Sequence, residues 1–335
     1  MTRRTTLVAT AATAAALVLA GCSGSSTDAT GTSSDTTNAG SGDTYRIGIT
    51  QITTHTSLDA AREGFKKAFE DAGINVEFDE QNAQGDQATA TSIASKFAEG
   101  DLDLVLAVAT PSAQAVAQAI VDTPVLFTAV TDPVSAQLVD SLEAPGSNIT
   151  GTSDMNPVAD QIKLIKQLDA EAKTVGIIYS SGEVNSEVQV KIAKETAEAE
   201  GLTVVEKTVT NSAEVQQAAQ SLAGSVDAIY APTDNTVVSA LTSVVQAAED
   251  AKIPLVVGES DSVANGGLAT YAIDYSTLGY QTGEMAIKIL TEGADPATLP
   301  VETQNEYQLT INTSTAAVIG LTIPEDLLAQ AITIE

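Results

Sequence analysis

The stretches DLVLAVAT (residues 103–110) and DAIYAPTD (residues 227–234) hold equivalent places in a unit that the chain contains twice. In each copy a further strand-like stretch precedes them, YRIGI and TVGIIY, and another follows them, TPVLF and IPLVV. Equivalent stretches of the two copies lie roughly 124 to 130 residues apart, a matching spacing that indicates a repeated lobe. Because each central strand ends in polar residues, the repeat predicts two similar lobes with a binding cleft.

Strands and helices alternate along the body of the chain. The helix expected over residues 58–72, for example, places Leu58, Ala61 and Phe65 on one face and ends at Gly73. Such alternation is typical of a parallel sheet covered by helices on both faces. We therefore predict an α/β fold with two doubly wound parallel-sheet lobes joined by a multi-strand hinge. Lobe 1 comprises residues 44–150 and about 276–303, and lobe 2 comprises residues 151–275 and about 304–335.

The N-terminal segment has the composition of a secretory signal. Arg3 and Arg4 precede an apolar stretch over residues 7–20. This stretch is too short to span a bilayer stably, but its length suits a signal peptide. We predict a signal peptide over residues 1–21.

Cys22 is the only cysteine of the chain, and it follows Leu19-Ala20-Gly21. This arrangement resembles a bacterial lipobox, in which the cysteine is acylated, for example with palmitate, and becomes the mature N-terminus. The alternative is an unmodified thiol beside an ordinary cleavage site. Residues 22–43 carry almost no large apolar side chain, so they are expected to be a flexible linker between the lipid anchor and the folded lobes. The predicted location is extracytoplasmic, on the cell membrane.

The charge balance is strongly acidic, with 44 Asp and Glu against 15 Lys and Arg and a formal net charge of −29. This balance excludes nucleic acid as an expected partner. A single histidine and a single cysteine make a structural metal site unexpected, and we predict no metal and no cofactor. No G-x-x-x-x-G-K-[ST] motif occurs, so nucleotide hydrolysis by this chain is not expected.

The segments that follow the predicted strands are rich in hydroxyls, amides and carboxylates, and none contains Lys or Arg. They are residues 51–57, 110–114, 128–133, 233–236 and 259–261. Ligands of doubly wound sheets bind beyond the carboxyl ends of the strands. A phosphate or another multiply charged anion would lack a compensating cation there. The pattern therefore favours a neutral or zwitterionic ligand.

A free amino acid suits these segments. Thr110 and Ser112 flank a proline at an expected helix start, where hydroxyls and backbone N–H groups hold a carboxylate. Asp234 occupies the position in lobe 2 that Thr110 holds in lobe 1, and Glu259 aligns with Ala129. These two residues offer carboxylates to an ammonium group. The alternative is that Thr110, Ser112 and Asp234 only cap helices.

A hydrolase is another possible class of protein, because His55, Ser57 and Asp59 lie close together in the sequence. All three belong to one loop and helix start, where Ser57 is better placed to cap the helix than to be activated. No G-x-S-x-G motif is present. We predict that the protein is not an enzyme and has no catalytic residues.

Several short motifs together resemble the solute-binding lipoproteins of ABC importers, in the group associated with tryptophan, tyrosine and phenylalanine uptake. The matching stretches are NAQGD at 82–86, ATPSAQA at 109–115, AVTDPV at 129–134, PGSNITGTSD at 145–154, PTDN at 232–235 and LAT at 268–270. The resemblance implies the type I periplasmic-binding fold. It also implies a monomeric protein that binds a small-molecule ligand and acts with an ABC permease and its ATPase.

The resemblance and the cleft pattern together give a set of expected ligand contacts. These are Gln51, His55, Thr110, Ser112, Thr131, Asp132, Asp154, Asn185, Asp234 and Glu259. The expected ligand is a free amino acid, with an aromatic one favoured. An aromatic side chain would stack on Tyr45, Phe127, Tyr179, Tyr230 or Tyr275. The alternatives are a neutral nucleoside, a sugar or a branched amino acid, or a sensor that reports its ligand to a membrane kinase.

Overall fold

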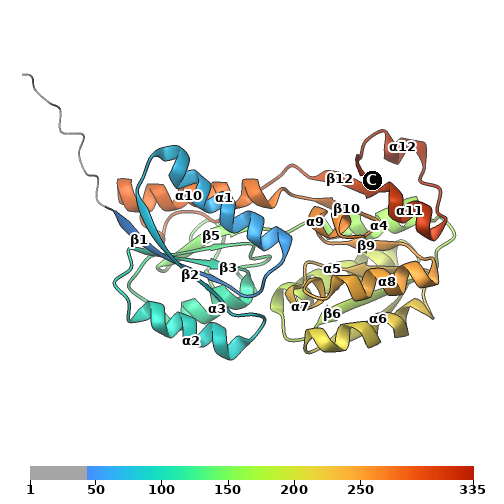
Figure 1. Cartoon of the computed structure of the whole chain (residues 1–335), viewed down its shortest axis with the longest axis horizontal. Coiled ribbons are helices and arrows are strands. Elements are labelled where there is room, and N and C mark those ends of the chain that lie inside the picture. Colours follow the sequence, from blue (N-terminus) through green and yellow to red (C-terminus); the bar gives the residue numbers. More distant parts are fainter. Residues whose placement is uncertain (1–43) are drawn as a thin grey trace, which may run out of the picture. The chain divides into compact units, whose positions relative to one another are not determined.

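The computed structural model describes residues 44–335, which contain two α/β lobes (Figure 1). The predicted signal peptide, Cys22 and the linker up to residue 43 lie outside the described residues. Within residues 44–335, no helix combines the length and the apolar character that crossing a membrane requires.

Lobe 1 is built on a parallel sheet of six strands in the order β11-β5-β4-β3-β1-β2. The strands are β1 (Tyr45–Gln51), β2 (Val76–Asn82), β3 (Leu104–Val108), β4 (Val125–Thr128), β5 (Ile149–Ser153) and β11 (Glu302–Thr303). Helices α1 (Thr56–Ala72) and α10 (Tyr275–Glu292) pack together on one face, and α2 (Gln87–Ala98) and α3 (Thr110–Ala119) cover the other (Figure 1).

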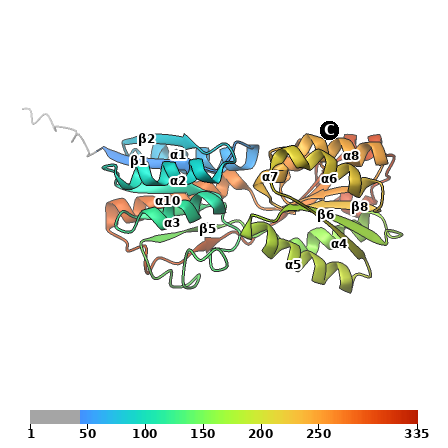
Figure 2. The same ribbon diagram turned by 90° about the horizontal axis from the view of Figure 1, so that it is seen from below.

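Lobe 2 is built on a sheet of seven strands in the order β13-β12-β10-β9-β8-β6-β7. The strands are β6 (Thr174–Ser180), β7 (Thr203–Val209), β8 (Ala228–Ala231), β9 (Leu255–Val257), β10 (Ala269–Ala272), β12 (Gln308–Asn312) and β13 (Ile332–Ile334). Helices α4 (Val158–Leu168) and α5 (Val184–Ala199) lie on one face, and α6 (Val215–Ala223) and α8 (Leu241–Ala251) on the other (Figure 2).

Five short helical segments complete lobe 2. They are the 3-10 turn Ser212–Glu214, α7 (Asn235–Val238), α9 (Ser260–Ala264), α11 (Thr313–Ile319) and α12 (Glu325–Leu328). Helices α7 and α9 begin directly after β8 and β9, at the edge of the sheet where ligands of this fold class bind.

Two details differ from the sequence-based expectation. The strand β5 crosses the expected boundary between residues 150 and 151, and it pairs entirely within the sheet of lobe 1. The pair β10–β12 is antiparallel, so the sheet of lobe 2 is mixed instead of fully parallel. Hydrophobic runs do not reveal strand direction, and β12 returns to this sheet from lobe 1 without a crossover helix.

The chain crosses between the two sheets three times within the described residues: after β5, between β10 and α10, and between β11 and β12. Each lobe has its own apolar core. Phe65, Phe69 and Phe127 are at most 1% exposed in lobe 1, and Ile162, Ile165 and Tyr230 are fully buried in lobe 2. Lobes with separate cores and several short connections can move as rigid bodies about a hinge.

Candidate functional site

A small polar cavity lies between the carboxyl ends of the strands of both lobes. Lobe 1 and its helix α10 contribute His55, Leu58, Ala129, Thr131, Asp154 and Tyr275, and lobe 2 contributes Asn185, Thr233, Asp234, Asn235 and Glu259. About 260 Å³ of space free of protein atoms lies among these side chains, part of it open to solvent, so the side chains nearly fill the cavity in this structure. Among residues 44–335, three carboxylates and no Lys or Arg line this cavity, which favours a ligand group that carries positive charge.

Asp154 is the carboxylate with an oxygen to spare. It follows β5 and is 4% exposed. Its Oδ2 atom accepts a hydrogen bond of 2.8 Å from the Tyr275 hydroxyl, whereas Oδ1 is buried and has no hydrogen-bond partner among the described residues. Burial raises the pKa of Asp154, because the charged form is deprived of water. A cationic donor from a ligand would satisfy Oδ1 and offset this cost.

Glu259 is a second buried carboxylate in the cavity, and it lies directly before α9. Its Oε1 atom accepts a hydrogen bond of 2.9 Å from the Ser262 hydroxyl. Burial raises the pKa of Glu259 to about 8, and the nearby charges of Asp261, Asp154 and Asp234 raise it further. Without a cationic partner, Glu259 therefore holds a proton at neutral pH, and none of the described side chains lining the cavity is a Lys or Arg that could stabilise its charged form.

Asp234 also lines the cavity, but both of its oxygens are engaged within lobe 2. Oδ1 accepts from the backbone N–H of Val237 at 2.8 Å, which makes Asp234 the N-cap of α7. Oδ2 accepts from the backbone N–H of Ser180 at 2.5 Å and from the Ser186 hydroxyl at 2.6 Å. Burial, together with the charge of Glu183, raises the pKa of Asp234 to about 7. The structure thus gives Asp234 the capping role that the sequence left as the alternative.

The start of α3 offers hydroxyl groups, as the sequence predicts. Ala109, the residue before the helix, has φ = 76°, a left-handed conformation that is uncommon for alanine. Beyond it, Thr110 Oγ1 and Ser112 Oγ are both buried without a hydrogen-bond partner among the described residues. Neither caps the helix, and neither lines the small cavity directly. Free hydroxyls at a helix N-terminus are suited to an anion.

His55 and Asn185 supply two more unpartnered atoms. Burial lowers the pKa of His55 to about 4, although a hydrogen bond with Asn235 and the charge of Asp59 oppose this shift. The ring is therefore neutral at pH 7, and its buried Nδ1 has no described partner. Asn185 donates from Nδ2 to Glu183, Ser186 and the carbonyl oxygen of Thr233, which leaves its buried Oδ1 unpaired.

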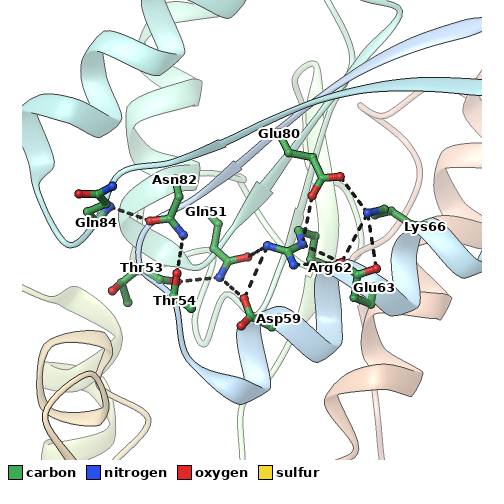
Figure 3. Close-up of polar contacts among 10 residues, drawn as sticks. All are labelled: Gln51, Thr53, Thr54, Asp59, Arg62, Glu63, Lys66, Glu80, Asn82 and Gln84. Carbon is green, nitrogen blue, oxygen red and sulfur yellow. Dashed lines mark hydrogen bonds and ion pairs between the residues drawn. The ribbon is translucent and has the colours of Figure 1, made fainter.

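Gln51 does not line the cavity, although it was expected to contact the ligand. Its Nε2 donates to the Thr53 carbonyl oxygen at 2.7 Å and to Asp59 Oδ1 at 2.8 Å, and its Oε1 accepts from Arg62 (Figure 3). Arg62 also pairs with Glu63 and Glu80, at 2.9 and 3.3 Å. This network fixes the loop between β1 and α1, and it occupies the guanidinium away from the cavity lining.

Asp132 and Ser57 likewise make contacts that differ from expectation. Asp132 does not line the cavity, and its carboxylate accepts hydrogen bonds from Val134 and Ser135 in its own turn. Ser57 does not cap α1. Its hydroxyl instead donates to Asp261 Oδ2 of lobe 2 at 2.7 Å. Because that hydroxyl is bonded to an acid of the other lobe, no pairing of Ser57 with His55 as a nucleophile and base is present.

Four cavity-lining residues were absent from the expected ligand contacts and stacking residues: Leu58, Ala129, Thr233 and Asn235. Thr233 and Asn235 adjoin Asp234 in the motif after β8, so their position could have suggested them. Tyr275 is the one residue of the five proposed stacking aromatics that lines the cavity. Tyr230 and Phe127 are fully buried in the cores instead.

Comparison with known proteins supports the importer family. A sequence profile of the family described as "ABC transporter substrate binding protein" matches residues 46–334. A protein named "Tyrosine-binding protein" from Clostridioides difficile is 44% identical over 308 residues, which span 91% of this chain and 88% of that protein.

Two solved structures of similar proteins share the fold of this chain, one with a ligand bound and one without. An ABC domain from Streptococcus pneumonia in complex with L-Trp is 38% identical, with a TM-score of 0.85 over 88% of this chain and 100% of that one. A ligand-free, open substrate-binding protein from Clostridium difficile is 45% identical, with a TM-score of 0.66 over 87% and 99% of the two chains. The two-lobed α/β fold predicted from the sequence is that of the type I periplasmic-binding proteins. The chain belongs to the family of ABC transporter substrate-binding proteins, as its motifs predicted.

Proposed function

We propose that this substrate-binding protein captures a free α-amino acid with an aromatic side chain and delivers it to a membrane permease driven by a separate ATPase. The two lobes close around the amino acid, and no covalent chemistry takes place.

The observation that carries the proposal is the set of carboxylates in the cavity. Asp154 Oδ1 has no partner within the described residues, Glu259 lies in the same cavity, and no basic side chain lines it. An α-ammonium group supplies the missing positive charge and N–H donors, whereas a sugar or a nucleoside supplies no positive charge. Charge-assisted hydrogen bonds of this kind contribute about 1.5–3 kcal/mol each.

The ligand carboxylate has a complementary place at the start of α3. The Thr110 and Ser112 hydroxyls are buried without partners, and the positive end of the helix dipole lies beside them. The aromatic side chain is supported by two relatives, one named for tyrosine and one solved with L-Trp. The closed arrangement is supported by the higher TM-score with the L-Trp complex than with the ligand-free, open protein, which has the higher sequence identity.

The test is calorimetric titration of the full chain with the twenty amino acids, a set of nucleosides and a set of sugars. We expect micromolar or tighter binding of aromatic amino acids, which corresponds to about −8 kcal/mol. Binding confined to branched amino acids would retain the ammonium site but reject the aromatic ligand. Binding of a nucleoside or sugar, and of no amino acid, would refute the proposal. A ligand-dependent response of a membrane kinase, without uptake, would assign sensing instead of import.

We also propose that Cys22 carries the lipid that holds the protein on the outer face of the cell membrane. Two acyl chains bury enough CH₂ groups, at about 0.8 kcal/mol each, for stable attachment. Mass spectrometry of the mature N-terminal peptide should detect acylated Cys22, and Cys22→Ser should release the protein from the membrane fraction. An unmodified Cys22 in membrane-bound protein would contradict this proposal.

A further inference from the structure

The topology assigns different ends of the cavity to different parts of the ligand. Asp154 follows β5 and Glu259 follows β9, whereas His55 follows β1 and Asn185 lies at the start of α5 after β6. In the sheet of lobe 1, β1 is three strands from β5, and in lobe 2, β6 is two strands from β9. At about 4.8 Å per strand, the strands that carry the two pairs of residues are roughly 10–14 Å apart, and their side chains approach one another to line one cavity.

This separation orients an amino acid in the cavity, if the proposed function is correct. The ammonium group belongs beside Asp154 and Glu259. The carboxylate belongs on the side of the α3 N-terminus, because β3 lies between β4 and β1. Thr110 and Ser112 at this N-terminus do not themselves line the cavity. The end of the cavity beside β1 and β6 is then left for the side chain of the ligand, which extends toward His55 and Asn185.

Both residues keep a buried polar atom unsatisfied at this end. His55 Nδ1 and Asn185 Oδ1 have no hydrogen-bond partner within residues 44–335. A neutral imidazole nitrogen either donates or accepts, and an amide oxygen accepts. Buried polar atoms without a partner are costly, so an apolar ligand tip at this position would leave that cost unrelieved.

We infer that His55, with Asn185, determines specificity by hydrogen bonding to the N–H or O–H group on the ligand's aromatic side chain. This inference rests on the proposed function and refines it. The protein would select an indole or a phenol over a plain phenyl ring, because only the first two carry a group that can pair with these atoms. Leu58, which also lines the cavity, supplies an apolar contact to the ring. Sites built around such a hydrogen bond discriminate strongly against analogues that lack it.

A matched pair of variants tests the inference. In both His and Asn, a polar atom that can form hydrogen bonds lies three bonds from Cα. Leu has nearly the same shape as Asn but carries no polar atom. The full-length wild type, His55→Asn and His55→Leu are titrated with L-tyrosine, L-tryptophan and L-phenylalanine. We expect His55→Leu to weaken tyrosine or tryptophan binding at least tenfold and phenylalanine binding less than twofold, with His55→Asn recovering most of the loss.

The other outcomes separate this inference from the proposed function. Equal losses for all three amino acids would place His55 against the ammonium or carboxylate group and overturn the inference. Equal behaviour of His55→Leu and His55→Asn would also overturn it, since the hydrogen bond would then be irrelevant. If the wild type bound none of the three amino acids, the proposed function itself would fail. Matching thermal unfolding curves for the two variants control for misfolding.

Discussion

Asp154 and Asp234 are both buried aspartates that line the ligand cavity, yet their surroundings assign them different tasks. Asp154 has one oxygen bonded to Tyr275 and one oxygen without a described partner. Asp234 has both oxygens bonded to groups of its own lobe, including the N-terminus of α7. We therefore assign the ligand ammonium to Asp154 and a structural role to Asp234.

The substitutions Asp154→Asn and Asp234→Asn should separate these roles. Asp154→Asn keeps the shape but removes the charge that faces the ammonium, so we expect amino-acid affinity to fall more than tenfold with little change in stability. Asp234→Asn places an N–H group against the N–H of Ser180 or Val237, which should lower the free energy of unfolding by about 1–3 kcal/mol. Calorimetry and urea unfolding of both variants measure the two effects. A larger loss of affinity in Asp234→Asn would reverse the assignment.

The sequence could place both aspartates at the cleft, but it could not tell them apart. Both follow predicted strands, and both have polar neighbours. Asp234 is saturated because β6 and α5, about 50 residues earlier in the chain, bring Ser180 and Ser186 against it. The position of Gln51 outside the cavity lining has a related cause, since Asp59 and Arg62 of α1 form hydrogen bonds with its amide. Such partners depend on tertiary packing and leave no local signal.

Glu259 should make the stability of the ligand-free protein depend on pH. Its pKa is raised to about 8 in the folded state, compared with 4.5 as its ordinary value. Between these values the folded protein holds a proton that the unfolded chain has released, so the free energy of unfolding decreases as pH rises. We expect a higher melting temperature at pH 6 than at pH 8. Asp154 and Asp234, whose pKa values are also raised, contribute in the same direction.

The variant Glu259→Gln isolates this contribution. It should reduce the pH dependence of the melting temperature and raise the melting temperature at pH 8, because a buried charge is removed while an acceptor for Ser262 is kept. It should also weaken amino-acid binding. An unchanged pH profile in scanning calorimetry would show that Glu259 does not hold the proton.

At the scale of secondary structure, the sequence predicted the elements well where apolar residues have a clear period. The helix expected over residues 58–72 is α1, and its C-cap is Gly73 with φ = 67°, as the glycine stop signal predicted. The expected boundary between the lobes fell inside β5, because the sequence of this strand, ITGTS, is short and consists mostly of polar or small residues. Its pairing with β4 depends on Gly151, where a Cβ atom would collide with the backbone of Phe127.

The contact between α1 and α10 depends on glycines in the same way. A Cβ atom added at Gly279 would overlap the backbone of Ala61, and one added at Gly64 would overlap the carbonyl of Ser276. We expect Gly279→Ala to push the helices apart and to lower the free energy of unfolding by about 1–3 kcal/mol in urea titrations. Gly224→Ala is the matched control, because its Cβ would meet only an atom of Gln220 at 3.9 Å. Equal stability of the two variants would show that the close helix contact carries no constraint.

At the scale of the two lobes together, the proposed function has them close around the ligand. The residues that line the cavity lie beside a contact between the lobes. The Ser57 hydroxyl of lobe 1 donates to Asp261 Oδ2 of lobe 2 at 2.7 Å. Ser57 lies two residues after His55, and Asp261 lies two residues after Glu259. The starts of α1 and α9 therefore each present one residue to the cavity and another to the opposite lobe, which couples ligand contact to closure.

Ser57→Ala should consequently shorten the lifetime of the closed complex. Loss of one partly buried hydrogen bond to a carboxylate is expected to increase the ligand dissociation rate about fivefold to tenfold, while the association rate changes little, because the bond forms only after the lobes meet. Ser135→Ala is the control, since it removes a hydroxyl that donates to Asp132 at 2.8 Å within lobe 1 alone.

Stopped-flow measurements on Ser57→Ala, Asp261→Asn and the double variant would give the coupling between the two residues. Additive effects of the two substitutions would show that this hydrogen bond does not hold the lobes closed.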